Sequence, residues 1–287
     1  MTELLLKGAP VAAALDEATK AEAEALRANG KTPTLAMLRI GAREDDLSYE
    51  RAAIKRCGKT GVALRTLELP EDTDNDMLLR VIDGLNRDET VHGILLFRPL
   101  PRRLDEEAAR RLLAPEKDVD GCTDASLGGV FTTTGGPRCG FPPCTAQAVM
   151  EILRYYQIDP MGKRVAVVGR SLVVGRPVAM LLMGAGATVT VCHSQTADLP
   201  AVTREAEIIV AACGKPELLG ADYFTPGAGQ IVIDVGVNWS EQKQTLCGDV
   251  DFAAVEPLVG AITPVPGGVG GVTTSVLVSH VVQAAKE

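Results

Sequence analysis

Residues 164–177 read RVAVVGRSLVVGRP, and this stretch decides the fold of the second half of the chain. Its apolar, β-branched start at 165–168 is typical of a buried parallel strand. Glycines follow at positions 169 and 175, and the helical run VAMLLMG comes next. This order predicts a strand, a tight turn and a helix N-terminus, where free N–H groups and the helix dipole bind an anion such as phosphate.

The glycine spacing of this turn differs from the usual dinucleotide fingerprint. GxGxxG places glycines at offsets 0, 2 and 5, whereas Ser171 stands here in place of the middle glycine. The letters alone therefore match weakly, but the strand–turn–helix context is the one that the fingerprint requires. We interpret the turn as a nucleotide site, and the alternative is a βα turn that binds nothing.

Length and composition limit the class of protein. A chain of 287 residues, 46% of them hydrophobic, is long enough for two folded domains. The net charge of −8 argues against nucleic-acid binding, and no apolar run is long enough to cross a membrane. Seven cysteines without a CxxC pair, and no signal peptide, predict a reduced cytoplasmic protein. Since there are only three histidines, we expect no His-rich metal site.

Two series of alternating strands and helices predict an α/β fold with two parallel-sheet domains, the second of them Rossmann-like. The expected strands are 34–41, 63–69, 91–97, 164–169, 187–192, 207–213 and 230–236. The expected helices outside the glycine turn are 11–28, 44–57, 72–86, 104–113, 145–156 with Thr145 as N-cap, and 273–286. The glycine-rich stretches 122–143 and 263–271 are expected to be loops.

The end of the second Rossmann-like strand indicates which dinucleotide binds. NAD usually needs an acidic residue there for the ribose hydroxyls, but VCHSQT at 191–196 contains none. Arg170 in the glycine turn and Ser194 could together hold a 2′-phosphate, which favours NADP. The alternative for Arg170 is a solvated loop cation.

Three further features supply candidate site residues. Tyr49 lies on the helix after the first strand, at the edge where α/β sheets bind ligands, so it either stacks on a flat ligand or is half-buried packing. Asp118 and Asp120 of KDVDG could bind a polar heterocycle or a cation, or they form a solvated acidic turn. TPVPGGVGG at 263–271 allows a ligand to approach bare backbone, or it is an interdomain hinge.

Seven motifs of this chain occur together in one family. They are GRSxxVGRP, PEKDVDG, PPCTAQ, CHSQT, IDVGVN, GDV and ITPVPGGVG. With them the chain resembles the methylenetetrahydrofolate dehydrogenase/cyclohydrolase family of one-carbon metabolism, from about Thr34 onward. The resemblance implies oxidation of 5,10-methylenetetrahydrofolate to the methenyl form with NADP, a small-molecule folate substrate and a homodimer. Many members then hydrolyse the methenyl product to 10-formyltetrahydrofolate.

The resemblance also implies a domain division and roles for particular residues. A folate-binding catalytic domain at 1–144, completed by the helix 273–287, and a Rossmann-like NADP-binding domain at 145–272 are expected, with a cleft between them. The implied catalytic residues are Tyr49, which would stack on the folate, and Asp120, which would hold the pterin ring. Pro266 and Gly267 would border the folate pocket. The implied NADP site consists of Gly169, Arg170, Ser171, Ser194 and Val237, with Thr145 near the cofactor.

Two departures from the family motifs concern the hydrolytic step. The family's YVxxK motif places a lysine four residues after the tyrosine, on the same helix face, but that position is Ala53 here. Lys55 lies about 240° round the helix from Tyr49 and points elsewhere. The glutamine of the family's QLPLP motif is Phe97, within FRPLP. Since the lysine and glutamine serve hydrolysis chiefly, we predict a dehydrogenase with weak or absent cyclohydrolase activity.

Three alternatives stay open at this point. One is the full bifunctional enzyme, in which Arg98 or Lys55 takes the place of the lysine. A second is a folate- or nucleotide-binding homologue without turnover. A third, another two-domain dehydrogenase of the shikimate type, fits less well, because no lysine is convincingly placed for its Lys–Asp proton transfer.

Overall fold

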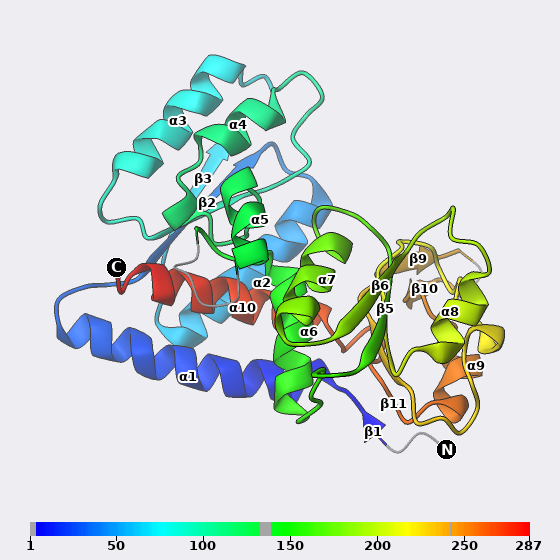
Figure 1. The fold of residues 1–287 in the computed structure, drawn as a ribbon. Coiled ribbons are helices and arrows are strands. Elements are labelled where there is room, and N and C mark those ends of the chain that lie inside the picture. The colour runs from blue at the N-terminus through cyan, green and yellow to red at the C-terminus, as the bar shows by residue number, and fades with distance from the viewer. Residues whose placement is uncertain (1–3, 133–138, 242) are drawn as a thin grey trace. The chain divides into compact units, whose positions relative to one another are not determined.

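The computed structural model describes residues 4–132, 139–241 and 243–287, and the chain divides into two compact units (Figure 1). Unit 1 comprises residues 1–12 and 145–273, and unit 2 comprises residues 13–144 and 274–287. The sequence predicts a folate domain from residue 1 to 144, whereas residues 4–12 group with unit 1. The reason is that β1 (Leu4–Leu5) pairs in parallel with β11 (Ala261–Ile262).

Unit 2 is built on a parallel sheet with helices on both faces. Its strand order is β3 (Ala63–Leu69), β2 (Thr34–Ile40), β4 (Gly93–Leu96).

One face of this sheet packs its aliphatic side chains against α3 (Asn75–Arg87) and α4 (Glu106–Leu112). Because side chains alternate along a strand, Arg39 of β2 points to the other face. There its Nε donates to Glu50 of α2 (Glu44–Thr60) over 2.9 Å, so α2 covers that face.

The helices of unit 2 begin at their capping residues. The Asp74 carboxylate accepts the Met77 N–H over 2.8 Å, so α3 begins at Asn75 rather than at the predicted position 72. Asp105 caps α4 in the same way, by accepting the Ala108 N–H over 2.9 Å. Each carboxylate pairs a helix N–H that has no partner within the helix.

The predicted loop at 122–143 contains helical turns. Thr123 accepts the Ser126 N–H over 3.1 Å and starts α5 (Asp124–Gly129), which η2 (Val130–Thr132) follows. The loop prediction is wrong for this part, because the Gly-rich composition hid a threonine N-cap. Residues 133–138 of the same predicted loop lie outside the described residues.

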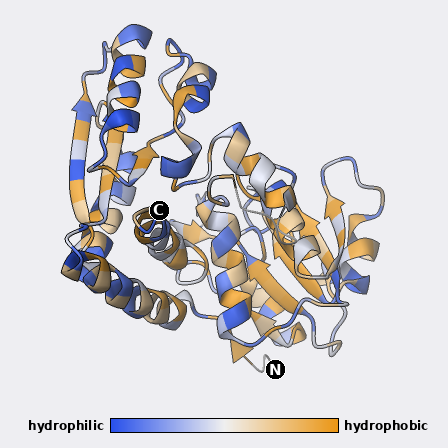
Figure 2. Cartoon of the chain, turned by 60° about the vertical axis from the view of Figure 1, so that its left-hand side comes forward, coloured by the Kyte–Doolittle hydropathy of each residue, from blue (hydrophilic) through white to orange (hydrophobic). Residues whose placement is uncertain are grey.

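Unit 1 contains a parallel sheet in the order β1–β11–β8–β7–β5–β6. Its central strands β5 (Arg164–Val168), β7 (Ile208–Ala211) and β8 (Ile231–Asp234) are made almost entirely of buried aliphatic residues. Figure 2 shows this sheet as strongly hydrophobic. Such strands are typical of a parallel sheet that is covered on both faces. The predicted two-domain α/β architecture is confirmed.

The remaining elements agree with the predicted order, with shifted ends. Cys144 rather than Thr145 begins α6, so Thr145 is a helical residue and not the predicted N-cap. Within the described residues, no helix is both long and apolar enough to cross a membrane. The further bounds are β6 (Thr188–Cys192), β9 (Asn238–Ser240), β10 (Thr245–Cys247), α1 (Gly8–Ala28), α6 (Cys144–Tyr155), α7 (Gly175–Gly184), α8 (Leu199–Glu205), α9 (Phe252–Val255), α10 (Gly270–Ala284), η1 (Pro115–Lys117), η3 (Ala221–Tyr223) and η4 (Glu256–Leu258).

Candidate functional site

A lysine fixes the PEKDVDG segment of unit 2. Lys117 donates its Nζ to three backbone carbonyl oxygens at and just beyond the end of α3, at distances between 2.7 and 3.1 Å. The C-terminal end of a helix attracts a cation, because its carbonyl groups are unpaired and its dipole is negative there. Lys117 thereby anchors the segment that carries Asp118 and Asp120.

Asp118 is completely buried, and its carboxylate is fully engaged by the protein. It accepts the N–H groups of Cys122 and Thr123 over 3.0 and 2.7 Å, and the Ser126 hydroxyl over 2.6 Å. These bonds fold the chain into the turn that precedes α5. Asp118 is therefore neither a solvated acidic residue nor available to a ligand.

Asp120 is held much more loosely than Asp118. Its side chain is 26% exposed, and its Oδ2 lies 3.5 Å from Nη2 of Arg98. Burial raises the pKa of Asp120 to about 6, and the positive charge of Arg98 opposes this rise. The second Nη atom of Arg98 lies 3.7 Å from Oε1 of Glu106. Asp120 therefore offers a carboxyl group with a pKa of about 6 and with capacity for further hydrogen bonds.

Tyr49 on α2 belongs to the same cluster. Its ring meets Phe97 edge-on, with the ring centroids 6.2 Å apart. Its hydroxyl oxygen is buried and has no hydrogen-bond partner among the described residues. Burial raises the pKa of Tyr49 well above its ordinary value, and Cys144 and Asp120 add to the effect. A buried hydroxyl without a partner is costly, so it marks a place that a ligand or water completes.

The position of the family's lysine is apolar and enclosed in this chain. Ala53, one helical turn after Tyr49, is completely buried. Lys55 is exposed, in line with its predicted orientation away from that face. The cation beside Asp120 is instead Arg98, from the loop after β4. From the sequence, Arg98 is predicted only as an alternative to the missing lysine.

Sequence reasoning missed two further residues of unit 2. Cys144 donates its Sγ to the Val119 carbonyl oxygen over 3.1 Å, and burial followed by the Asp120 charge raises its pKa. His280 on α10 stacks on Phe141, with ring centroids 4.8 Å apart. The PPCTAQ motif was a signal for Cys144, whereas His280 lies in an apolar helical run that gave none.

The glycine turn of unit 1 is shaped by close backbone contacts. Gly169 has φ +136°, and a Cβ atom there would lie 2.0 Å from the Ala212 carbonyl oxygen. A Cβ atom at Gly175 would lie 2.2 Å from the Gly169 carbonyl oxygen. The Ser171 hydroxyl accepts the N–H groups of Val174 and Gly175 over 3.1 and 3.4 Å, at the start of α7. The two glycines and the serine are therefore required to bring bare backbone to the helix N-terminus.

Three more of the predicted cofactor residues are exposed around this turn and its neighbouring strands. Arg170 lies in the turn, Ser194 follows β6, and Val237 follows β8. Because these strands are parallel, their C-terminal ends lie at one edge of the sheet. An exposed cation, bare backbone and a helix N-terminus fit the phosphates of a dinucleotide. Thr145 lies in the first turn of α6.

The remaining two predicted residues also lie in unit 1. Pro266 and Gly267 are exposed in the segment between β11 and α10. The Gly267 carbonyl accepts the Gly8 N–H over 2.8 Å, which ties this segment to the start of α1. Their contact with folate stays a prediction.

A second cluster of buried carboxylates lies at the C-terminal end of β8. Asp234 accepts the N–H groups of Gly236, Asp249 and Val250 at 3.0, 3.0 and 2.9 Å. Burial raises the pKa of Asp234 to about 7. Asp249 accepts four donors: the N–H groups at 213, 214 and 215, and the side-chain amide of Asn238. This cluster joins the ends of β7 and β8 to the hairpin of β9 and β10.

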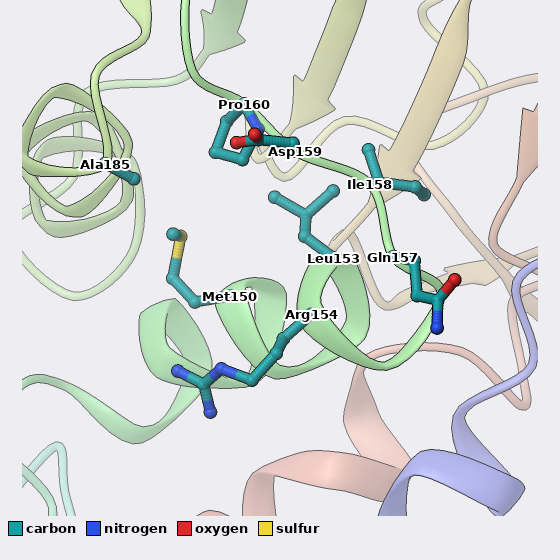
Figure 3. A pocket seen from close by; sticks show the side chains of 8 residues that line it. All are labelled: Met150, Leu153, Arg154, Gln157, Ile158, Asp159, Pro160 and Ala185. Carbon is teal, nitrogen blue, oxygen red and sulfur yellow. The ribbon is translucent and has the colours of Figure 1, made fainter.

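A hollow of about 370 Å³ in unit 1 contains none of the predicted site residues. Figure 3 shows Met150 and Leu153 of α6 pointing toward Pro160, with Arg154 at the rim. Its other lining residues are Gln157, Ile158, Asp159 and Ala185. It lacks the aromatic ring and buried acid of the Tyr49–Asp120 cluster, so we do not place the reaction there.

Known protein families match the chain in two parts, one for each half. The catalytic-domain model of tetrahydrofolate dehydrogenase/cyclohydrolase matches residues 6–120, and the NAD(P)-binding-domain model of the same family matches residues 143–287. A relative from Carboxydothermus hydrogenoformans, "Bifunctional protein FolD", is 49% identical over 98% of this chain and 96% of its own length. The protein of that name from Clostridioides difficile is 48% identical over the same shares.

Solved structures agree with the sequence relatives. The bifunctional FolD enzyme of Campylobacter jejuni has a TM-score of 0.93 and 38% identity, with 98% of each chain covered. The FolD enzyme of Trypanosoma brucei, solved with NADP and an inhibitor, has a TM-score of 0.91 and 36% identity, and covers 100% of this chain and 98% of its own. The family resemblance predicted from the motifs is thus confirmed, and so is an NAD(P)-binding domain. The chain belongs to the tetrahydrofolate dehydrogenase/cyclohydrolase family.

Proposed function

We propose that this protein is an NADP-dependent 5,10-methylenetetrahydrofolate dehydrogenase. The observation that carries the proposal is the cluster of Tyr49, Arg98 and Asp120 in unit 2. Tyr49 Oη and Arg98 Nε are buried there without hydrogen-bond partners among the described residues. Polar atoms left unpaired in an enclosed cluster fit a site that a polar ring completes. The glycine turn of unit 1 supports a dinucleotide as the second ligand.

In this proposal each predicted residue has a defined task. The Asp120 carboxylate accepts N–H groups of the pterin, and the Tyr49 ring stacks on its face. NADP supplies the hydride acceptor when bound, so the dehydrogenase step requires no side-chain nucleophile. The residues proposed to hold NADP are Gly169, Arg170, Ser171, Ser194, Val237 and Thr145, and those proposed to border the folate are Pro266 and Gly267.

We further propose that the hydrolytic step is weak or absent. Attack by water on the methenyl product requires a group that takes a proton, and position 53 offers only an alanine methyl group. Arg98 cannot replace a lysine as a base, because a guanidinium stays protonated in proteins. Burial alone lowers the pKa of Arg98, but Cys122, Asp120 and Glu106 raise it overall.

The second candidate function is the full bifunctional reaction, and two observations favour it. The relatives from C. hydrogenoformans and C. difficile carry the name "Bifunctional protein FolD". In addition, burial raises the pKa of Asp120 to about 6, so its carboxylate is a competent proton acceptor at neutral pH. Under this candidate, Asp120 rather than a lysine activates the water.

A homodimer and a cytoplasmic location complete the proposal. Trp239 and Leu246 are opposite each other in the β9–β10 hairpin and are 57% and 42% exposed, which fits a subunit contact. All seven cysteines are free, which fits a reducing compartment. Sedimentation that gives the mass of one chain at micromolar concentration would contradict the dimer.

A paired assay on one purified sample tests the proposed reaction. With methylenetetrahydrofolate and NADP, we expect NADPH to form while methenyltetrahydrofolate accumulates and decays only at the rate in buffer. Consumption of the methenyl product faster than in buffer would establish the bifunctional candidate instead. Binding of both ligands without NADPH would indicate a non-catalytic homologue.

A matched variant sharpens the hydrolytic half of this assay. The double substitution Ala53→Lys with Phe97→Gln restores both family side chains. We expect it to hydrolyse the methenyl product at least about tenfold faster than the natural sequence, because a positioned proton-transfer group contributes that much or more. An unchanged hydrolysis rate in a folded double variant would show that these two positions do not decide the second step.

A further inference from the structure

The loop after β4 places a guanidinium beside the one loosely held carboxylate of unit 2's cluster. Arg98 Nη2 lies 3.5 Å from Asp120 Oδ2, and its side chain is only 17% exposed. Its Nε–H is buried without a partner among the described residues. The protein therefore encloses this cation without using all its donors.

Several contacts fix the position of Arg98 from its backbone. Arg43 donates through Nη2 to the Arg98 carbonyl oxygen over 3.3 Å and through Nη1 to the Pro99 carbonyl oxygen over 3.1 Å. Arg43 is itself paired with Asp46 of α2 over 2.7 Å. On the other side, Glu106 Oε2 accepts the Leu100 N–H over 2.8 Å. The loop is thus clamped between α2 and α4.

The clamp leaves the guanidinium between two carboxylates. Oε1 of Glu106, at 3.7 Å, is the more distant, since Glu106 already serves the backbone of the loop. Asp120 is the nearer at 3.5 Å, and Arg98 is the cation that acts on it. The arrangement suits a role in which the charge of Arg98 is directed at Asp120.

We propose that Arg98 is a positioning residue of the folate site, which keeps Asp120 ionised and oriented to accept the N–H groups of the pterin. This inference rests on the proposed function of Asp120. It also treats two changes of the family motifs as one exchange: the lysine of YVxxK is Ala53 on α2, and the first leucine of QLPLP is Arg98 in the loop after β4. The exchanged cation is a guanidinium, which holds an anion but does not accept a proton.

The groups around Asp120 decide what a pH profile reports. They are Arg98 after β4, Asp118 and Cys122 of its own segment, Cys144 at the start of α6 and Tyr49 on α2. Burial also raises the pKa values of Cys122, Cys144 and Tyr49, so these groups stay neutral across the pH range of the assay. Two more titratable groups face the cluster: Glu106 of α4, whose Oε1 lies 3.7 Å from Arg98, and His280 of α10, whose Nδ1 lies 3.8 Å from Cys144 Sγ. The titration of Asp120 is therefore followed as the difference between the natural protein and its variants.

The experiment measures kcat and KM for methylenetetrahydrofolate from pH 5 to 9 in Arg98→Leu, the residue type of the family motif. We expect the acidic limb of kcat/KM to move up by about 1 to 2 pH units, because a neighbouring cation lowers a carboxyl pKa by that amount or more. The change should appear in KM, with kcat at saturating substrate and high pH near that of the natural protein. Arg98→Lys should move the acidic limb most of the way back toward that of the natural protein, since it restores the charge.

Two controls separate this role from a structural one. Arg102→Leu removes the same charge from an exposed position four residues on, and should leave the profile unchanged. An unshifted acidic limb in folded Arg98→Leu would overturn the proposal, even if the variant unfolds at a lower temperature. If the natural protein itself forms no NADPH, the proposed function fails first, and a pH titration of folate binding in the same variants then tests Arg98 directly.

Discussion

Each unit holds a carboxyl group whose pKa is raised, but the two groups differ in how many hydrogen bonds they accept. In unit 1, Asp234 accepts three backbone N–H groups, and the adjoining Asp249 accepts four donors. In unit 2, Asp120 has only the Arg98 guanidinium, at 3.5 Å, and the Cys144 thiol as side-chain partners, and its side chain is 26% exposed. The difference teaches that a perturbed pKa does not by itself mark a reaction site. An incomplete set of hydrogen bonds around the group is the better guide.

The largest expected effect comes from a substitution that disrupts the Asp234–Asp249 cluster of unit 1. Asp249→Ala removes the acceptor of four part-buried hydrogen bonds, and a hydrogen bond to a charged group contributes roughly 1.5 to 3 kcal/mol. We expect the free energy of unfolding in urea to fall by about 4 kcal/mol or more. Asp251→Ala is the matched control, because Asp251 only caps α9 and should cost about 1 kcal/mol. Equal losses in the two variants would contradict the structural role given to Asp249.

The next effect separates two aspartates of a single segment. Asp118→Asn places an amide where three donors point, so we expect a loss of roughly 2 to 3 kcal/mol in stability. Asp120→Asn should cost less than about 1 kcal/mol in stability, since the group is partly exposed and loosely paired. It should instead lower kcat/KM for the folate by at least about 100-fold, because an amide presents an N–H to the pterin where a carboxylate oxygen accepted one.

Urea unfolding and steady-state kinetics on both variants test this pair. The roles would be exchanged if Asp120→Asn kept its activity while Asp118→Asn kept its stability and lost binding of the folate.

The third expected effect is a pH dependence of stability. The pKa of Asp234 is raised to about 7 and that of Asp120 to about 6, so the folded chain keeps protons that the unfolded chain has lost above pH 4. The free energy of unfolding should therefore decrease as the pH rises from about 5 to 7. Burial lowers the pKa of His92, and this shift opposes the decrease without reversing it. The pKa values of Asp88 and Glu207 are lowered, chiefly by hydrogen bonds from Thr90 and Lys163, so these groups titrate below this window.

Urea titrations at pH 5, 6 and 7 measure this slope. Asp234→Asn cannot titrate at this position, so its slope should be flatter than that of the natural protein. A slope that is unchanged in Asp234→Asn would show that other groups cause it.

The sequence predicted the architecture well, because alternation and β-branched runs report directly on buried parallel strands. β3 has the predicted bounds, and β5 differs from its prediction by one residue. The short β1 was not predicted, since two residues carry no periodicity and its pairing partner is β11, far along the chain. α5 was missed because glycines around a Thr123 N-cap resemble a loop.

The candidate site was predictable only where a residue lies in a motif. Tyr49 and Asp120 could be named from the family motifs, and the structure places them in one cluster. The different roles of Asp118 and Asp120 could not be predicted, because both residues belong to the same acidic run and only their hydrogen bonds distinguish them. Arg98 was visible as a change of motif, but its distance to Asp120 depends on a contact between the end of β4 and a segment two elements later.

The division of the chain between the two units also has a consequence for the order of synthesis. A ribosome makes residues 13–144 early, yet unit 2 lacks its last helix until residues 274–287 follow. Val276, Leu277 and Val281 of α10 are buried, so the unfinished unit presents an uncovered apolar surface. Likewise β1 is made first and has no neighbour in its sheet until β11 emerges. Both units thus reach their complete form only when nearly all of the chain has been made, and a nascent chain that stalls near residue 260 exposes apolar surface in both of them.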